Sequence, residues 1–408
     1  MTLLKRGAIR SAELVLGLVV AAALVFATDW AVGRLVPLLA IPKRGLVLLP
    51  HSVRQFDYPI FSYTERVNSL GLRDHEVTLG PSPHYRILVI GDSFVYGSGV
   101  ELEDTWVKVV ERRLRDRGFD VEVVNGGRPG SGPAEQRRLA ECAIPRLCPN
   151  LVVIAHLQGD DAIQAMGVFI PWYTTLLPEL AGVAALWHEY RMNAEFRIPD
   201  TPTVESAEQH RRTLVEAAAA MYRDSPPLAK RRFESLPVEV LGAYFRGELN
   251  PWSVSIAMSS PRYFWPAAFD SPDGIDSVQC REAIDGMASH FKRINRLARR
   301  EGGHAVALVT PHGPYVNAEA RRNLGRMGYD VPDAAFHNTL PERVVMRACD
   351  RAGVPCYVDG VQGFRDRQDE PGLYFSTDVH FTVAGNRLFA DLVTPILAEI
   401  IAQDVPEP

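Results

Sequence analysis

The sequence is short of cysteine and has no recognisable metal-binding pattern. Its five Cys and eleven His are dispersed over 408 residues, without a C-x-x-C, H-E-x-x-H or H-x-H motif, so we expect neither a metal nor a cofactor. A basic excess is also missing, since 44 Lys and Arg face 49 Asp and Glu, and nucleic acid is therefore not an expected partner. The 47% hydrophobic content excludes a disordered chain and is enough for one large or two ordinary domains.

The cysteine spacing leaves two interpretations open. Cys142 and Cys148 are six residues apart, Cys349 and Cys356 are seven apart, and Cys280 is left over. Two disulfides are compatible with this spacing in an oxidising compartment, but five unpaired thiols fit it equally well, because spacing alone does not establish pairing.

The N-terminus has the pattern of a membrane anchor. Lys5, Arg6 and Arg10 precede an apolar run at 14–28, and residues 11–32 together reach spanning length. The run ends in FATDW without a small-residue cleavage site, which favours an uncleaved anchor over a cleaved signal peptide. We therefore predict a single-pass protein of the inner (cytoplasmic) membrane whose remaining chain lies on the periplasmic or extracellular side.

From residue 85 onward, short β-branched runs alternate with helical stretches, which predicts an α/β domain with a parallel sheet. The five predicted strands are Arg86–Ile90, Val121–Val124, Leu151–Ala155, Ala305–Thr310 and Cys356–Val358. Helices are predicted near Asp104–Arg117, Ser277–Arg300 and Ala384–Gln403, with Pro395 expected to kink the last one or to begin its second part.

Residues 162–276 interrupt the alternation and are rich in Trp, Tyr, Phe and Ala. A helix over Pro202–Arg223, begun by Thr201, is predicted within this insertion. Its length implies structure of its own, which either covers the site or only thickens the core. The expected organisation is a cytoplasmic tip and anchor at 1–45, a lead-in at 46–84, a main domain at 85–161 and 277–408, and the helical insertion at 162–276.

Ser93 is the candidate nucleophile. It follows the first strand in Gly91-Asp92-Ser93-Phe94, at the carboxyl end of a parallel strand, where open α/β sheets place their sites. A serine hydroxyl needs a base to accept its proton. Alone, the motif is equally typical of a turn, because Gly, Asp and Ser all favour turns.

A base and a group to orient it occur just before the last helix. His380 can accept the Ser93 proton, and Asp378 can fix the imidazole tautomer, as in a serine triad with the chain order Ser, Asp, His. The alternative is a His380 that only packs under the helix. The placement of all three residues at expected strand and helix ends favours the triad.

Two more motifs follow the second and third strands. Residues 125–132 read NGGRPGSG, and the backbone N–H of Gly130 could join that of Ser93 in an oxyanion hole. Residues 158–161 read QGDD and also end a strand. A dinucleotide loop is disfavoured, because the glycines run G-x-x-G-x-G and no ribose-binding acid is evident.

Together, GDSF, NGGRPGSG, QGDD and D-V-H resemble the blocks of the SGNH/GDSL hydrolase superfamily over roughly residues 85–161 and 304–400. The segment Asn68-Ser-Leu-Gly-Leu-Arg-Asp74 resembles the lead-in of membrane-anchored bacterial members. The resemblance implies a three-layer α/β/α sandwich, a Ser93–His380–Asp378 triad, and Gly130 as an oxyanion-hole residue.

The chain departs from this superfamily at two positions. Asp160 stands where active members carry an oxyanion-binding Asn, so a neutral Asp160 or the amide of Gln158 would have to donate instead. The usual D-x-x-H spacing would place Thr377 at the Asp position, whereas this chain has D-x-H, as in the branch that includes the alginate O-acetylation proteins.

The predicted function is that of a membrane-anchored, exported serine esterase acting on an acyl or acetyl ester, with polysaccharide or lipid as the expected substrate class. Transfer of the acyl group to a sugar hydroxyl is one alternative. The other is a degenerate member that binds glycan or protein, because an ionised Asp160 would repel the developing oxyanion.

Overall fold

The computed structural model describes residues 46–166, 203–271 and 273–405, together with a few residues between 13 and 28. The chain divides into two units, and the elements described below belong to the unit formed by residues 45–167 and 201–408. The predicted anchor at 11–32 lies partly outside the described residues. In the part of the chain that is described, no helix combines the length and the apolar character needed to cross a membrane.

A five-stranded parallel sheet forms the centre of this unit, as predicted. Its strands run in the order β4-β3-β5-β7-β8. Their bounds are β3 Tyr85–Gly91, β4 Val121–Gly127, β5 Leu151–Leu157, β7 His304–Thr310 and β8 Cys356–Tyr357. Each of the five predicted strands is present within a few residues of its expected limits. Parallel strands that are buried on both faces consist almost entirely of apolar residues, so their positions can be located in the sequence.

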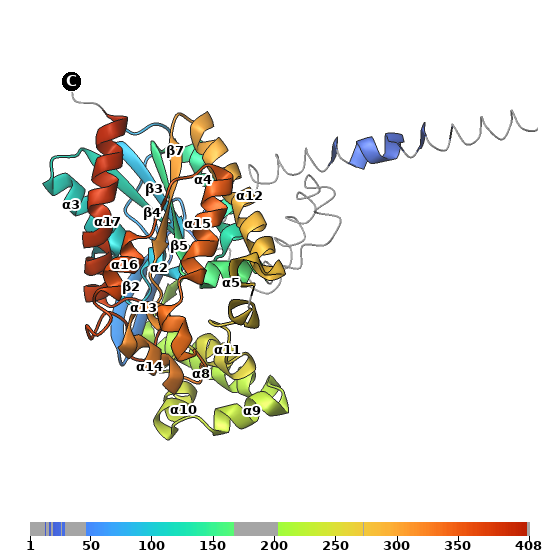
Figure 1. Cartoon of the computed structure of the whole chain (residues 1–408). Coiled ribbons are helices and arrows are strands. Elements are labelled where there is room, and N and C mark those ends of the chain that lie inside the picture. Colours follow the sequence, from blue (N-terminus) through green and yellow to red (C-terminus); the bar gives the residue numbers. More distant parts are fainter. Residues whose placement is uncertain are drawn as a thin grey trace, which may run out of the picture. The chain divides into compact units, whose positions relative to one another are not determined.

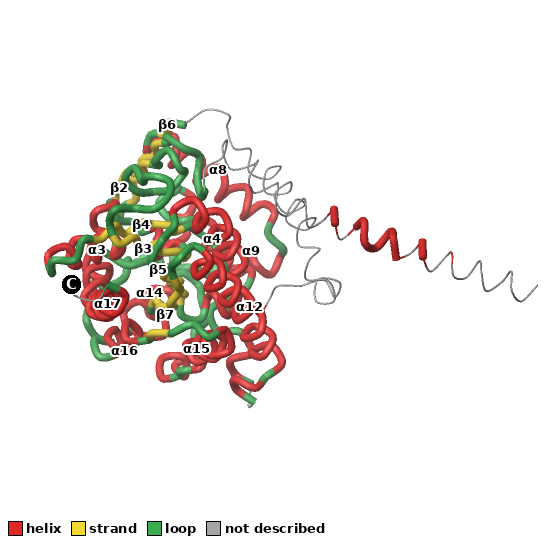
Figure 2. The backbone as a smooth tube through the Cα atoms, turned by 90° about the horizontal axis from the view of Figure 1, so that it is seen from above, coloured by secondary structure: helices red, strands yellow, loops and turns green. Residues whose placement is uncertain are grey.

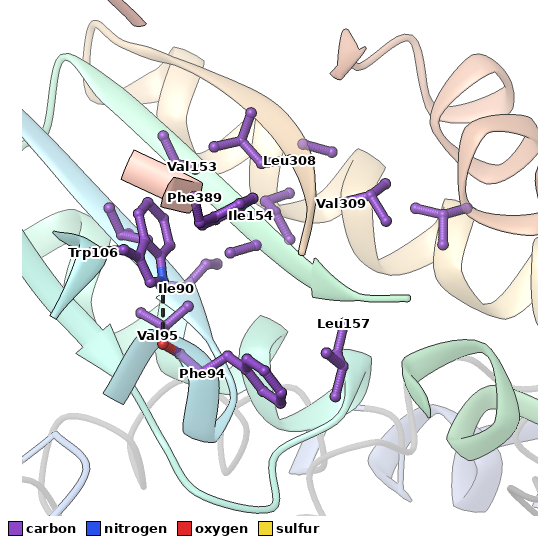
Figure 3. Packing of buried hydrophobic residues seen from close by; sticks show 14 of the residues in the cluster. Ile90, Phe94, Val95, Trp106, Val153, Ile154, Leu157, Leu308, Val309 and Phe389 are labelled. Atoms are coloured by element: carbon purple, nitrogen blue, oxygen red, sulfur yellow. Dashed lines mark hydrogen bonds between the residues drawn. The ribbon is translucent and has the colours of Figure 1, made fainter. Parts of the chain in front are cut away.

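The sheet is buried on both faces. Ile87 to Ile90 on β3 and Leu151 to Ile154 on β5 are fully inaccessible to solvent. Figure 3 shows part of this core, in which Ile90, Val153 and Ile154 pack beside Trp106 and Phe389. Burial of this many branched side chains is the main favourable term for the fold, at about 25 cal/mol per Å² of apolar surface.

Helices cover the two faces and complete the three layers (Figures 1 and 2). On one side lie α3 (Trp106–Asp116), α16 (Asp359–Arg365) and α17 (Val383–Asp404), and on the other lie α4 (Pro133–Leu147), α5 (Asp160–Met166), α12 (Val278–Arg300) and α15 (Leu340–Ala352). The expected three-layer sandwich is therefore what the described residues form.

Pro395 does not divide the C-terminal helix. α17 is continuous from Val383 to Asp404 with Pro395 inside it, so no second helix begins there. Both Pro395 and Asp391, whose carbonyl would have bonded to the missing N–H, lie on the exposed side of α17. Water can satisfy that carbonyl, which is why the helix tolerates the proline.

A second, three-stranded sheet joins the segment predicted only as a lead-in to the start of the described part of the insertion. β1 (Val53–Tyr58) pairs antiparallel with β2 (Phe61–Arg66) and parallel with the two residues of β6 (Val204–Glu205). Sequence analysis did not anticipate this sheet. The strands VRQFDY and FSYTER mix charged and aromatic residues, and the pairing with β6 links segments about 150 positions apart.

The described part of the insertion is mainly helical. It contains α8 (Ala207–Asp224), α9 (Pro227–Glu234), α10 (Val238–Phe245) and α11 (Pro251–Ser259). The predicted start of α8 at Thr201 is wrong, because Ser206 caps the helix through a capping box with Gln209. Figure 1 shows these helices beyond the same end of the sheet as α2 (Ser93–Tyr96), α13 (Gly313–Val316) and α14 (Ala318–Arg326).

Candidate active site

Ser93 is the first residue of α2, directly after β3. Asp92 caps this short helix by accepting a hydrogen bond of 2.9 Å from the N–H of Phe94. A side chain at Gly91 would approach the carbonyl oxygen of Ala155 to 2.8 Å, so only glycine fits between the neighbouring strand and the helix. This tight connection presents the Ser93 hydroxyl at the carboxyl end of the sheet.

The second half of the site comes from the loop before α17. The Nε2 atom of His380 lies 2.7 Å from the Ser93 Oγ, although the two residues are 287 positions apart. Asp378 Oδ1 contacts the Nδ1 atom of the same ring and accepts a 3.0 Å hydrogen bond from the His380 N–H. The three residues expected from the sequence thus lie in one chain of hydrogen bonds.

The local electrostatics keep Asp378 ionised. Burial acts to raise the pKa of Asp378, but the charge of His380 and hydrogen bonds from His380 and Val379 outweigh it and leave that pKa below its usual value. The carboxylate can therefore hold the Nδ1 proton of His380 and stabilise the imidazolium that forms when Ser93 is deprotonated.

Aromatic packing and backbone hydrogen bonds fix the His380 loop. The Phe94 ring lies 5.0 Å from the imidazole of His380, centroid to centroid. The Phe375 N–H donates to the His380 carbonyl at 3.1 Å, and Tyr374 forms a β-bridge with Phe381. These contacts fix the imidazole and the loop that carries it.

The second motif packs closely behind Ser93. A Cβ at Gly127 would lie 2.0 Å from the backbone nitrogen of Tyr96, so this glycine allows α2 to contact β4 directly. The Arg128 N–H and the Ser131 hydroxyl both donate to the Gly91 carbonyl at 3.0 Å. Gly130, at the tip of this turn, has a φ of +71° and open space beside it.

Asp160, in the third motif, is the first residue of α5. Its carboxylate accepts hydrogen bonds from the Gln164 amide, at 2.7 Å, and from the hydroxyl of Tyr263 in the insertion. Burial, followed by the neighbouring charge of Asp161, raises the pKa of Asp160 to about 6. Asp160 therefore changes its protonation state near pH 6.

The other two acids of this region have different surroundings. Asp161 is fully buried and accepts from the ring of His156, at 2.5 Å, and from the Leu157 N–H, at 2.8 Å. Burial and the charges of Asp161 and Asp160 raise the pKa of Asp92 well above its usual value. The charges of Asp161 and Asp160 thus disfavour ionisation of Asp92.

Gln158 does not offer its amide to the site. Its Nε2 atom donates to Glu342 at 2.9 Å, and its Oε1 atom accepts from the His312 N–H at 3.2 Å. Gln158 is also fully buried. These bonds argue against the expectation that Gln158 supplies an oxyanion donor, because both ends of its amide are already used.

Two residues near the site were missed in the sequence. Tyr263 belongs to the insertion and reaches Asp160, as described above. His312 follows β7, lies fully buried against the Phe94 and Phe264 rings, and has no described partner for either ring nitrogen. Burial, and then the nearby His380, lower the pKa of His312 to about 3, so its imidazole is neutral. A His directly after the fourth strand was the available signal.

Metal ligands are not gathered in the described part of the chain. Over those residues, no group of three or more His, Cys, Asp or Glu side chains is arranged to hold a metal ion. Cys148, Cys280, Cys349 and Cys356 are free thiols in the structure. The Cys349 and Cys356 thiols nevertheless contact each other, and this contact is the main cause of a raised Cys349 pKa, ahead of burial.

Comparison with known proteins gives one sequence relative that supports the superfamily resemblance. No protein-family model matches the chain. Over 80 residues, the chain is 34% identical to Esterase TesA of Pseudomonas aeruginosa, a match that covers 20% of this chain and 39% of that protein. The chain therefore spans about two-fifths of the length of the curated relative it matches.

Solved structures align over most of their own length but with low similarity. A crystal structure of TesA aligns with 76% of this chain and 97% of that one, at 14% identity and a TM-score of 0.33. A lipase/acylhydrolase from Enterococcus faecalis aligns with 77% and 96%, at 11% identity and a TM-score of 0.33. A G-D-S-L family lipolytic protein from Veillonella parvula aligns with 76% and 97%, at 8% identity and a TM-score of 0.33.

Proposed function

We propose that this chain is a serine esterase of the SGNH/GDSL type that cleaves an acyl or acetyl ester through Ser93, His380 and Asp378. The observation that carries the proposal is the 2.7 Å approach of His380 Nε2 to the Ser93 Oγ, with Asp378 on the other ring nitrogen. This is the geometry that nucleophile activation requires, because the base is within hydrogen-bond reach and is itself oriented by a third group.

The reaction has two half-steps. His380 accepts the Ser93 proton while Oγ attacks the ester carbonyl, which gives a tetrahedral oxyanion. The imidazolium returns the proton to the departing alkoxide, the C–O bond of the ester breaks, and an acyl-Ser93 ester remains. Water, or the hydroxyl of an acceptor, then loses its proton to His380 and attacks the acyl group. The bond between the acyl carbon and Ser93 Oγ breaks, and His380 returns the proton to Oγ, which releases the acid or the new ester.

The oxyanion needs hydrogen-bond donors in this site. The proposed donors are the backbone N–H groups of Ser93 and Gly130, with Asp160 as a third in its neutral form. Because the pKa of Asp160 is raised to about 6, its carboxyl group carries a proton at mildly acid pH and can donate. At higher pH, the ionised group would repel the oxyanion and slow the reaction.

Acyl transfer is supported as a second candidate by the position of Tyr263. This residue brings the insertion into contact with Asp160, beside the reacting atoms. A covered site excludes water and allows a bound hydroxyl to compete for the acyl-enzyme. The acceptor class we propose is a cell-envelope or secreted polysaccharide, or a lipid, in keeping with the proposed inner-membrane anchor at 11–32 and an exported site.

The test is covalent labelling of the full chain with a fluorophosphonate probe. We expect wild-type protein to be labelled, Ser93→Ala to be unlabelled, and Ser98→Ala, a serine from the same turn, to be labelled like wild type. Release of alcohol and of free acid from an acetyl ester, with and without a polysaccharide acceptor, then separates hydrolysis from transfer. A folded wild-type protein that takes up no label would overturn the proposal and favour a glycan- or protein-binding role.

A further inference from the structure

Residues 71–74, the end of the segment Asn68–Asp74, are buried beside the site, yet the proposed chemistry makes no use of them. Among them, Leu72 and Arg73 are each 1% exposed, and Asp74 is 6% exposed. A buried guanidinium is unusual, because removing its charge from water is expensive unless hydrogen bonds replace the lost hydration. The partners of Arg73 therefore indicate what this segment does.

Arg73 donates to the carboxyl-terminal end of the nucleophile helix. Its Nη1 atom donates to the carbonyls of Tyr96 and Gly97, at 2.9 and 2.7 Å, and its Nη2 atom donates to Val100 O at 2.6 Å. Carbonyls in the last turn of a helix have no partner within the helix. In α2, which is only four residues long, this end lies one turn from Ser93.

The contacted turn is bonded directly to the nucleophile. The N–H groups of Gly97 and Ser98 both donate to the Ser93 carbonyl, at 3.0 and 3.1 Å. The Trp106 indole N–H donates to the carbonyl of Phe94 at 3.1 Å, which Figure 3 shows as a dashed line. A shift of the Gly97 turn would therefore be transmitted to the backbone of Ser93.

Two aromatic rings contact the guanidinium of Arg73. Its carbon atom lies 4.7 Å from the Tyr63 ring centroid and 4.8 Å from that of Tyr96. The Tyr96 hydroxyl donates to Glu65, which, like Tyr63, is buried on one face of β2. A planar, stacked guanidinium with two donor nitrogens fits this arrangement, whereas a lysine ammonium can satisfy only part of it.

Asp74, the next residue, holds the end of β4. Its Oδ2 atom accepts from the Asn125 N–H at 2.7 Å, and its Oδ1 atom pairs with Lys108 at 2.6 Å. The Lys108 ammonium also donates to the Val123 carbonyl at 2.6 Å. Two adjacent residues thus bind the two segments that carry Ser93 and the Gly130 turn.

We propose that Arg73 is a positioning residue, which fixes the Gly97 turn and so sets the Ser93 hydroxyl at hydrogen-bond distance from His380. The inference rests on the proposed function, since it concerns the reactivity of the same serine. Gly97 is required for the same arrangement. Its φ is +81°, and a Cβ there would lie 2.2 Å from Thr105 and 3.4 Å from Arg73 Nη1, so no larger residue fits in this turn.

A matched control is available at the other end of β3. Arg86 is also fully buried and donates to Gly80 O, at 2.7 Å, and to Leu147 O, while its Nε atom pairs with Glu122 at 2.7 Å. It resembles Arg73 in residue type, burial and carbonyl contacts, but it lies at the amino end of the sheet, away from Ser93.

The experiment compares Arg73→Lys, Arg73→Ala and Arg86→Lys in the full chain. For each variant, the rate constant of fluorophosphonate labelling per folded molecule is measured, together with kcat and KM on an acetyl ester and the midpoint of urea unfolding. We expect Arg73→Ala to lower the labelling rate and kcat on the order of 10²-fold, with KM within about twofold, because an ångström of misplacement has an effect of that size. Arg73→Lys should recover part of the loss, and Arg86→Lys should keep the wild-type rate even where its midpoint falls.

The outcomes separate the two proposals. If wild-type protein is not labelled, the proposed function fails. If wild-type protein is labelled and the folded Arg73 variants react at the same rate, or if Arg86→Lys loses reactivity to the same extent, Arg73 has only a stabilising role and the inference is wrong.

Discussion

Two fully buried residues at opposite ends of the sheet differ in their hydrogen bonding. They are Arg86, at the amino end of β3, and His312, just beyond the carboxyl end of β7. Arg86 donates to two carbonyls and to Thr78, and it pairs with Glu122. Neither ring nitrogen of His312 has a partner among the described residues.

The contrast extends to neighbouring residues at the two ends. At the carboxyl end, the Asn125 amide nitrogen and the Thr310 hydroxyl also lack described partners, and the Asp92 and Asp160 carboxyls have raised pKa values. At the amino end, the Asn150 side chain accepts from the Arg86 N–H at 2.8 Å. Unsatisfied and perturbed groups persist where a protein uses them, so the difference identifies the functional end of the sheet independently of the motifs.

The largest expected effect tests which acid orients His380. Asp378→Asn should lower the rate of fluorophosphonate labelling by about 10³- to 10⁴-fold, because an amide favours the wrong imidazole tautomer and does not stabilise the imidazolium. Thr377→Val is the matched control, since Thr377 occupies the acid position of the commoner D-x-x-H spacing. Equal rates for Asp378→Asn and wild type would remove Asp378 from the site.

A second substitution tests the protonation of Asp160. In wild type, Asp160 is protonated below a pKa of about 6 and loses its donor as the pH rises through that value. Asp160→Asn donates at every pH, so the ratio of variant to wild-type kcat should be near one at pH 5 and approach about 10² at pH 8, the typical effect of one oxyanion donor.

The pH profile of kcat on an acetyl ester measures this ratio, with Asp120→Asn, an exposed acid of the β3–β4 connection, as the control. A ratio that does not change with pH, or an Asp160→Asn variant that is slower throughout, would show that Asp160 acts other than as a neutral donor.

The amino end of the sheet should respond in stability and not in reactivity. Arg86→Met removes the charge partner of Glu122 and the donor to two carbonyls, so the free energy of unfolding should fall by about 3 kcal/mol, as when a buried pair is broken. Urea unfolding measures the loss, and labelling of the folded fraction at the wild-type rate completes the prediction. A variant with slower labelling would mean that the two ends of β3 are coupled.

The features of this fold that could be predicted from the sequence are those that depend on residues close together in the chain. The strand β3 contains a continuous apolar run from Ile87 to Ile90, and a parallel strand of that kind delivers the residues after it to one edge of the sheet, which is why Ser93 could be singled out. The start of α8 was misplaced because Thr201 and Ser206 are both good capping residues, and only the bond between Ser206 and Gln209 decides between them.

The unpredicted features depend on contacts between distant segments. The sequence gives no sign that the Gln158 amide is already bonded, because its acceptor, Glu342, is 184 positions away. The contact of the Arg73 guanidinium with the Tyr63 and Tyr96 rings depends on a small sheet that was not predicted. Sequence patterns report periodicity and turn chemistry, and they carry no information on which buried donor meets which acceptor.

The smallest expected effect is also the most direct test of the contrast between the ends. His312→Leu removes two buried, unpaired ring nitrogens at nearly constant volume, so the free energy of unfolding should rise by about 1 kcal/mol. Asn295→Leu is the matched change at the amino end of β7, where the Asn295 side chain accepts from the Ala305 N–H at 3.1 Å, and it should lower stability by a similar amount.

Because the pKa of His312 is about 3, its imidazole is neutral between pH 5 and 8, and the gain in the free energy of unfolding should be the same at both pH values. Urea unfolding of the two variants measures both signs, and a loss of stability in His312→Leu would mean that water satisfies the ring and that the two ends of the sheet pair their polar groups equally well.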